Sequence, residues 1–101
     1  MSRYCSHTLI LPDENRLDNF VVEVDGCVTT YYPFTGEVHS TIYVDQPILI
    51  SYRPDLEGKT ISLSLLAWAL HSTEYGNTVM YAYRLVPCPS CVGNRFTMIR
   101  L

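Results

Sequence analysis

Residues 19–32 read NFVVEVDGCVTTYY, and this stretch decides the fold. Phe20, Val22 and Val24 recur at every second position, which places them on one face of a strand. The dipeptide Asp25-Gly26 follows, and it suits a two-residue hairpin turn because such a turn needs positive φ angles. We therefore predict a β-hairpin in which Asn19–Val24 pairs with Cys27–Tyr32.

Short apolar runs separated by turn residues continue on both sides of this hairpin. Proline, glycine, aspartate and asparagine cluster between the runs, where they favour turns. The further strands that this pattern predicts are Thr8–Leu11, Val38–Val44, Ile48–Tyr52, Val79–Val86 and Phe96–Leu101. About seven or eight short strands with regular turn signals indicate an all-β domain, either a small β-sandwich or a partly closed barrel.

The segment from Thr60 to Ser72 fits two structures. Ile61 and Leu65 belong to an alternation with serines that is typical of a strand, so we expect a strand over Ile61–Leu65. Residues 65–70 read LLAWAL and consist largely of good helix formers. A second strand or one short helix near residues 65–72 remains open, and we expect Trp68 to lie in the core.

Length and composition limit the class of protein. The 101 residues suffice for one domain, so we expect residues 1–101 to form a single β domain. With 48% hydrophobic and 17% charged residues the chain should fold, and its net charge of −3 without a basic cluster argues against nucleic acid as a partner. The longest apolar stretch, residues 63–70, is too short to span a membrane. No export signal is evident at the start of the sequence, so we expect a cytoplasmic protein with reduced cysteines.

Cys88 and Cys91 form the one motif whose spacing has a specific chemical meaning. Two thiolates in Cys-x-x-Cys spacing can hold one tetrahedral zinc ion, which makes these residues candidate metal ligands. The motif is half a site, and two more ligands would have to come from Cys5, His7, Cys27, His39 or His71. The alternatives are a proline-stiffened hairpin with two small thiols, which we favour, or redox use.

Tyrosines supply most of the aromatic side chains, with eight in the chain. Tyr31, Tyr32 and Tyr43 are candidates for an interface, because tyrosine combines apolar area with a polar end. Tyr81 and Tyr83 alternate with apolar residues and are expected to pack in the core.

We carry three functional hypotheses forward. The leading one is a noncatalytic domain that associates with another protein or with itself, through an unpaired edge strand and exposed tyrosines, without a cofactor. The second is a zinc-stabilised domain. The third is a hydrolase-related enzyme of unknown reaction that uses His39 or His71, for which the sequence contains no nucleophile signature or cofactor loop.

Part of the chain resembles a known accessory domain. Leu9–Asp13, then Asn19–Val28 with its Asp25-Gly26 turn, then Val44–Ile50 are similar in order to the composite β-sandwich that accompanies metal-dependent amidohydrolases. The resemblance implies a sandwich fold and an accessory or scaffolding role. In that family a metal-binding His-x-His pair follows the last of these strands, whereas this chain continues with Ser51–Pro54 and has no catalytic barrel. The resemblance therefore implies no hydrolase activity.

Overall fold

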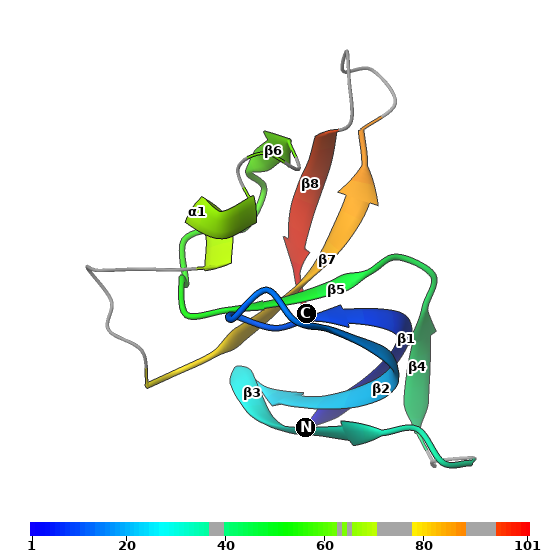
Figure 1. The fold of residues 1–101 in the computed structure, drawn as a ribbon. Helices are drawn as coiled ribbons and strands as arrows, with labels where there is room; N and C mark the ends of the chain where they lie inside the picture. The colour runs from blue at the N-terminus through cyan, green and yellow to red at the C-terminus, as the bar shows by residue number, and fades with distance from the viewer. Residues whose placement is uncertain (37–39, 63, 65, 71–77, 89–94) are drawn as a thin grey trace.

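The computed structural model describes residues 1–36, 40–62, 64, 66–70, 78–88 and 95–101. Eight strands and one short helix make up this part of the chain (Figure 1). They are β1 (Ser2–Ile10), β2 (Arg16–Asp25), β3 (Cys27–Pro33), β4 (Thr41–Val44), β5 (Ile48–Ser51), β6 (Thr60–Ser62), α1 (Leu66–Leu70), β7 (Tyr81–Pro87) and β8 (Arg95–Arg100). The predicted all-β fold class is confirmed.

The β2–β3 hairpin predicted from residues 19–32 is present, with a different turn. Asp25 belongs to β2 and pairs with Cys27, which leaves Gly26 alone at the tip with a φ of 75°. The register then shifts at Glu23 and Val24, which is a β-bulge. Glycine is required at the tip because a side chain disfavours this left-handed backbone.

β1 lies at the centre of one half of the sheet. It pairs antiparallel with β2 along one edge, and along the other edge it pairs in parallel with β4 and then with β5. Residues 45–47 read DQP and separate β4 from β5. Ser6 fixes this break, because its buried Oγ donates a hydrogen bond of 2.8 Å to the carbonyl of Gln46 and accepts one from the amide of Thr8.

Two apolar clusters lie on opposite faces of β5 and β7. Ile48, Ile50 and Ala82 contribute to one cluster, whereas Leu49 and Tyr83 contribute to the other. This alternation follows from the two-residue period of a strand. Both faces are covered, so all four residues of β5 are buried. The short helix α1 closes the second cluster with Ala69 and Leu70.

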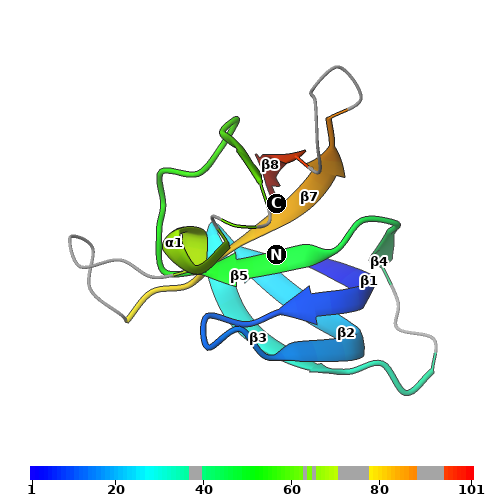
Figure 2. The ribbon, with the colours of Figure 1, turned by 45° about the horizontal axis from the view of Figure 1, so that its top comes forward.

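The sheet curls strongly without closing. Its strand order is β3-β2-β1-β5-β7-β8-β6, with β4 beside β1 off this path. The curl brings β3 back toward β7, where the Val28 amide donates a hydrogen bond of 2.8 Å to the Met80 carbonyl. Figure 2 shows β1, β2 and β3 folded under β5. The first apolar cluster fills the inside of this half-barrel, which fits the predicted sandwich or partly closed barrel.

The structure corrects several local predictions. The first strand begins at Ser2 rather than Thr8, and β4 begins at Thr41, residues 37–39 lying outside the described residues. The segment around Thr60 forms a three-residue strand and then the helix α1, so the helix alternative is confirmed. Trp68 is 44% exposed, so its placement in the core was wrong. In the described part of the chain no helix is long and apolar enough to cross a membrane.

Candidate functional site

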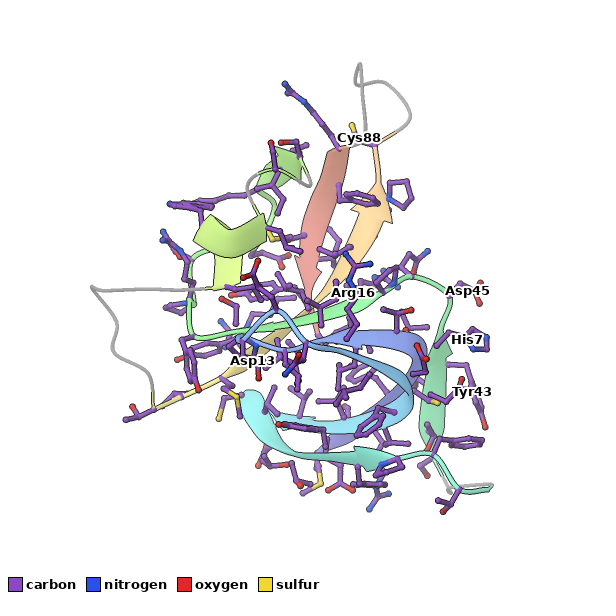
Figure 3. All side chains as sticks on the ribbon, viewed as in Figure 1. His7, Asp13, Arg16, Tyr43, Asp45 and Cys88 are labelled. Atoms are coloured by element: carbon purple, nitrogen blue, oxygen red, sulfur yellow. The ribbon has the colours of Figure 1, made fainter. Side chains whose placement is uncertain are left out.

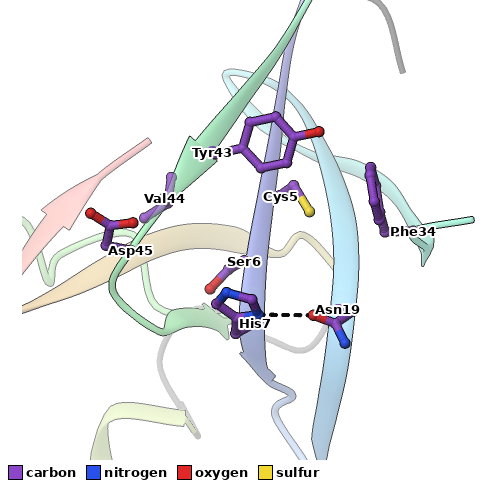
Figure 4. A pocket seen from close by; sticks show the side chains of 8 residues that line it. All are labelled: Cys5, Ser6, His7, Asn19, Phe34, Tyr43, Val44 and Asp45. Atoms are coloured by element: carbon purple, nitrogen blue, oxygen red, sulfur yellow. Dashed lines mark hydrogen bonds between the residues drawn. The ribbon is translucent and has the colours of Figure 1, made fainter. Parts of the chain in front are cut away.

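A pocket of about 110 Å³ opens between β1, β2 and β4. The side chains that line it come from the centre of β1, from β2, from the C-terminal end of β4 and from the residues that directly follow β3 and β4 (Figure 4). They are Cys5, Ser6, His7, Asn19, Phe34, Tyr43, Val44 and Asp45. The pocket is therefore built on the strands of the half-barrel.

β2 is kinked beside the pocket. Leu17 and Phe20 both pack against the first apolar cluster although they are an odd number of residues apart, so the alternation of β2 reverses between them. Asn19 lies at the reversal with a φ of 56°. Asparagine tolerates this left-handed backbone better than most residues because its short side chain bonds locally. The carbonyl of Asn19 accepts a hydrogen bond of 2.8 Å from the amide of Phe34, which holds the end of β3 beside the pocket.

The side chain of Asn19 orients His7. The imidazole Nδ1 and the Asn19 Oδ1 lie 2.9 Å apart, and the carbonyl oxygen accepts, so Nδ1 carries a proton. Figure 4 shows the other ring nitrogen pointing away from Asn19. In a neutral imidazole that nitrogen is a hydrogen-bond acceptor. His7 thus offers an acceptor in a fixed orientation.

Two aromatic rings and a thiol form the upper wall of the pocket. The centroids of Phe34 and Tyr43 lie 6.0 Å apart with their planes at 77°, an edge-to-face contact. Cys5 pairs with Tyr43 in the β1–β4 register and is buried, with 7% of its surface exposed. Burial raises the pKa of the Cys5 thiol. A buried thiol with a raised pKa is a poor nucleophile, so the wall is apolar and inert.

Asp45 lies at the rim of the pocket, directly after β4. Its carboxylate is exposed and makes no hydrogen bond or ion pair with any residue that the structure describes. It is the one carboxylate among the lining side chains. Figure 3 places Asp45, His7 and Tyr43 together beside β4.

The structure separates the three tyrosines predicted as an interface. Directly paired residues of neighbouring strands point to the same face of a sheet. Tyr32 of β3 pairs with Val21 of β2, which pairs with Cys5 of β1, and Cys5 pairs with Tyr43 of β4. Tyr32 and Tyr43 therefore share the outer face of the half-barrel. Tyr31 instead packs against the first apolar cluster and contacts the ring of Phe20 at 6.3 Å. Tyr81 and Tyr83 contact the second cluster, and Tyr83 is fully buried, as expected for core residues.

A polar network surrounds Tyr32. Its hydroxyl donates a hydrogen bond of 2.7 Å to Glu23, and the guanidinium of Arg3 donates another of 2.9 Å to the same oxygen. These bonds, from Tyr32 first and then from Arg3, hold the pKa of Glu23 below its usual value. The hydrogen bond to the carboxylate raises the pKa of Tyr32. The network fixes Tyr32 on the outer face.

β4 has a free edge. Within the described ranges it pairs with β1 alone, so its other edge presents unpaired backbone groups. Ile42 is 52% exposed and Tyr43 is 62% exposed, and as neighbours they point to opposite faces. The predicted unpaired edge strand therefore lies beside the pocket, and Tyr43 belongs to the strand and also lines the pocket.

The predicted metal ligands lie elsewhere. Cys88 follows β7 at the far end from the pocket and is disulfide-bonded, and Cys91 lies outside the described residues (Figure 3). Cys5 and Cys27 are free thiols. Among the described residues, no group of three or more histidine, cysteine or acidic side chains is placed to hold a metal ion. The zinc hypothesis requires reduced thiols and stays a prediction.

A second hollow is lined by Lys59, Thr60, Ile61 and Trp68. The Arg53 guanidinium lies 4.1 Å from the Trp68 ring centroid, which is a cation–π contact. Asp55 pairs with both Arg53 and Lys59, at 3.1 and 3.2 Å, so the positive charge at this hollow is partly neutralised.

Sequence reasoning named Cys5 and His7 as possible ligands but missed Asn19, Phe34 and Asp45 as parts of a site. The only signal for Asn19 was its residue type, which favours left-handed backbone. His39 and His71, the candidates for catalysis, lie outside the described residues.

Comparison of the chain with protein-family models, curated proteins and solved structures found no match. The resemblance of residues 9–50 to the composite domain of amidohydrolases is untested by these comparisons and stays a prediction.

Proposed function

We propose that this chain is a noncatalytic β domain that associates with a second copy of itself through the free edge of β4. The observation that supports the proposal most is that β4 combines an unpaired edge with two exposed apolar side chains, Ile42 and Tyr43. Natural proteins usually protect such an edge with a charged residue, a proline or a bulge. The sequence of β4, TIYV, contains no charged residue and no proline.

A second copy is the occupant that this edge fits best. Two β4 strands can pair antiparallel about a twofold axis at Tyr43, which puts Tyr43 opposite its own copy and Ile42 opposite Val44. No like charges then meet, because β4 is uncharged. The pairing would satisfy the free backbone groups of both edges and cover both exposed apolar side chains.

The expected dimer is weak. A strand pair with four residues from each chain is smaller than the roughly 1,200 Å² of a stable interface. We therefore expect a dissociation constant on the order of micromolar or above, with the aromatic side chains around Tyr43 adding contact area.

Size-exclusion chromatography with light scattering from about 1 μM to 1 mM tests the proposal against this expected affinity range. The wild-type mass should rise from monomer to dimer as concentration increases. Ile42→Lys adds a charge to the edge and removes apolar contact, so its dissociation constant should rise at least about tenfold. Val79→Lys is the matched control, because Val79 is also exposed, at 44%, and lies away from β4. A monomer at all concentrations, or equal dimerisation of the Ile42→Lys protein, would overturn the proposal.

Two further expectations belong to this proposal. A scaffolding role agrees with the resemblance to an accessory domain. A cytoplasmic location agrees with the free thiols of Cys5 and Cys27, whereas the disulfide at Cys88 is typical of oxidising compartments. The redox state of Cys88 in the cell, measured by thiol trapping, distinguishes the two locations.

A further inference from the structure

We propose that the pocket between β1, β2 and β4 binds a small organic cation, an alkylammonium or guanidinium group. This inference concerns the monomer, in which the Tyr43 ring is exposed, and it does not require self-association. It rests on the charge, the aromatic wall, the acceptors and the size of the pocket.

The charge of the pocket selects for a cation. Asp45 is charged and exposed, and its carboxylate has no partner among the described residues. No lysine or arginine is among the lining residues. A carboxylate at the rim of a small pocket attracts a positive group and disfavours an anion.

The aromatic wall offers a second attraction for a cation. Tyr43 is 62% exposed, so its ring is accessible, and its edge-to-face contact with Phe34 holds it in place. A cation within about 6 Å of a tyrosine or phenylalanine ring is attracted by the negative face of the ring. Tyr43 and Asp45 are two residues apart on the same segment, so one bound group can contact both.

His7 supplies a hydrogen-bond acceptor to the pocket. The Nδ1 proton of His7 is directed to Asn19, which leaves the other ring nitrogen of a neutral imidazole as an acceptor. Ammonium and guanidinium groups are donors without acceptors, so they match an acceptor and a carboxylate together. A neutral alcohol or amide lacks the positive charge that would pair with the Asp45 carboxylate.

The size of the pocket limits the ligand to a small group. Its volume of about 110 Å³ is room for a small group of a few heavy atoms. A guanidinium or a short alkylammonium fits this space, whereas a nucleotide or a folded peptide does not.

An NMR titration of the ¹⁵N-labelled full chain tests the inference. The probes are n-propylammonium chloride, n-propanol as the neutral analogue and sodium propionate as the anion, all at constant ionic strength. The ammonium should shift the amides of His7, Asn19 and Tyr43 and saturate, with a dissociation constant on the order of millimolar for so few atoms. Propanol and propionate should leave these amides unchanged. Equal shifts with propanol, or none with the ammonium, would overturn the inference.

Asp45→Asn removes the charge and keeps the size of the side chain. The dissociation constant for propylammonium should rise about fivefold or more, because a charge-assisted contact becomes a neutral one. Asp25→Asn is the matched control, since Asp25 is exposed at the end of β2 and does not line the pocket. Unchanged binding by the Asp45→Asn protein would overturn the inference, and its melting temperature shows that it folds.

Two further measurements separate the sources of the cation and the two proposals. Binding of Nα-acetyl-lysine methylamide more tightly than propylammonium would assign the pocket to a basic side chain of a protein, and equal binding would assign it to a free amine. The Ile42→Lys protein, in which the substituted side chain lies on the face opposite Tyr43, should still bind propylammonium. Its binding therefore reports on the pocket even if self-association fails.

Discussion

Replacing Asn19 with alanine should destabilise the half-barrel, because Asn19 is where β2 reverses its alternation. Its φ of 56° lies in the left-handed region. For an ordinary L-residue this conformation costs about 1–2 kcal/mol, and asparagine lowers the cost through local hydrogen bonds. The reversal lets Leu17 on one side and Phe20 on the other reach the same apolar cluster, so the chain cannot relax without exposing one of them.

The size of the effect can be worked out from these contacts. The left-handed backbone contributes about 1 kcal/mol when alanine replaces asparagine. The hydrogen bond to His7 is exposed and adds a few tenths. An Asn19→Ala protein should therefore lose about 1–1.5 kcal/mol, which in a domain of this length lowers the melting temperature by about 5–10 °C.

Asn19→Gly separates the backbone from the side chain. Glycine lacks the hydrogen bond to His7 in the same way as alanine, but it adopts positive φ freely. We expect Asn19→Gly to be more stable than Asn19→Ala by about 0.5–1 kcal/mol, despite the greater entropy of glycine in the unfolded chain. Urea denaturation of the three proteins measures these differences. If the glycine variant is as unstable as the alanine variant, or if alanine costs nothing, the left-handed kink does not hold the half-barrel.

Two further predictions concern the polar network and the cysteines. The pKa of Glu23 is lowered in the folded protein, so the carboxylate stabilises the fold at pH values above its ordinary pKa of 4.5, and this stabilisation is lost as the pH falls below that value. The difference in melting temperature between the wild type and Glu23→Gln should therefore shrink from pH 7 to pH 3. A constant difference would contradict this prediction. Elemental analysis of protein purified with reductant and no added metal tests the hypothesis that Cys88 and Cys91 bind zinc. One zinc ion per chain would support the hypothesis, and a zinc content well below one per chain would exclude it.

The β-hairpin was predictable because its residues alternate with the period of a strand and Asp25-Gly26 marks a turn. The buried strand Ile48–Ser51 was predictable as a short apolar run between turn residues, and Tyr81–Pro87 because Tyr81, Tyr83 and Leu85 alternate. These are local properties of the sequence. The full length of β1 was not predictable, because Arg3–His7 is mostly polar and forms a strand only through its neighbours β2 and β4.

Trp68 shows how a local pattern can mislead. Its apolar neighbours suggested a core position, but the five-residue helix α1 turns Ala69 and Leu70 inward and leaves Trp68 outside. Arg53 covers part of the exposed ring. Successive side chains of a helix are rotated by about 100° around its axis, so Trp68 points to a different side than Ala69 and Leu70. The burial of Trp68 therefore depended on how this segment folds, which the sequence left open.

The pocket was beyond sequence reasoning for a different reason. His7, Asn19 and Asp45 are distant in the sequence, and they are brought together by the antiparallel pairing of β1 with β2 and the parallel pairing of β1 with β4. That pairing depends on the route of the chain between β3 and β4 and on the curl of the sheet. Asp45 appeared as a turn residue, and nothing local distinguishes it from the other acidic turn residues.

Amide hydrogen exchange of β4 tests the central claim, association through its free edge, most directly. In a strand the amides alternate between its two edges, so every second amide of Thr41–Val44 should point away from β1. We predict that these amides exchange quickly in dilute protein and become protected as the concentration rises, whereas amides near Val79 do not change. Exchange rates in β4 that stay the same over the whole concentration range would contradict the account.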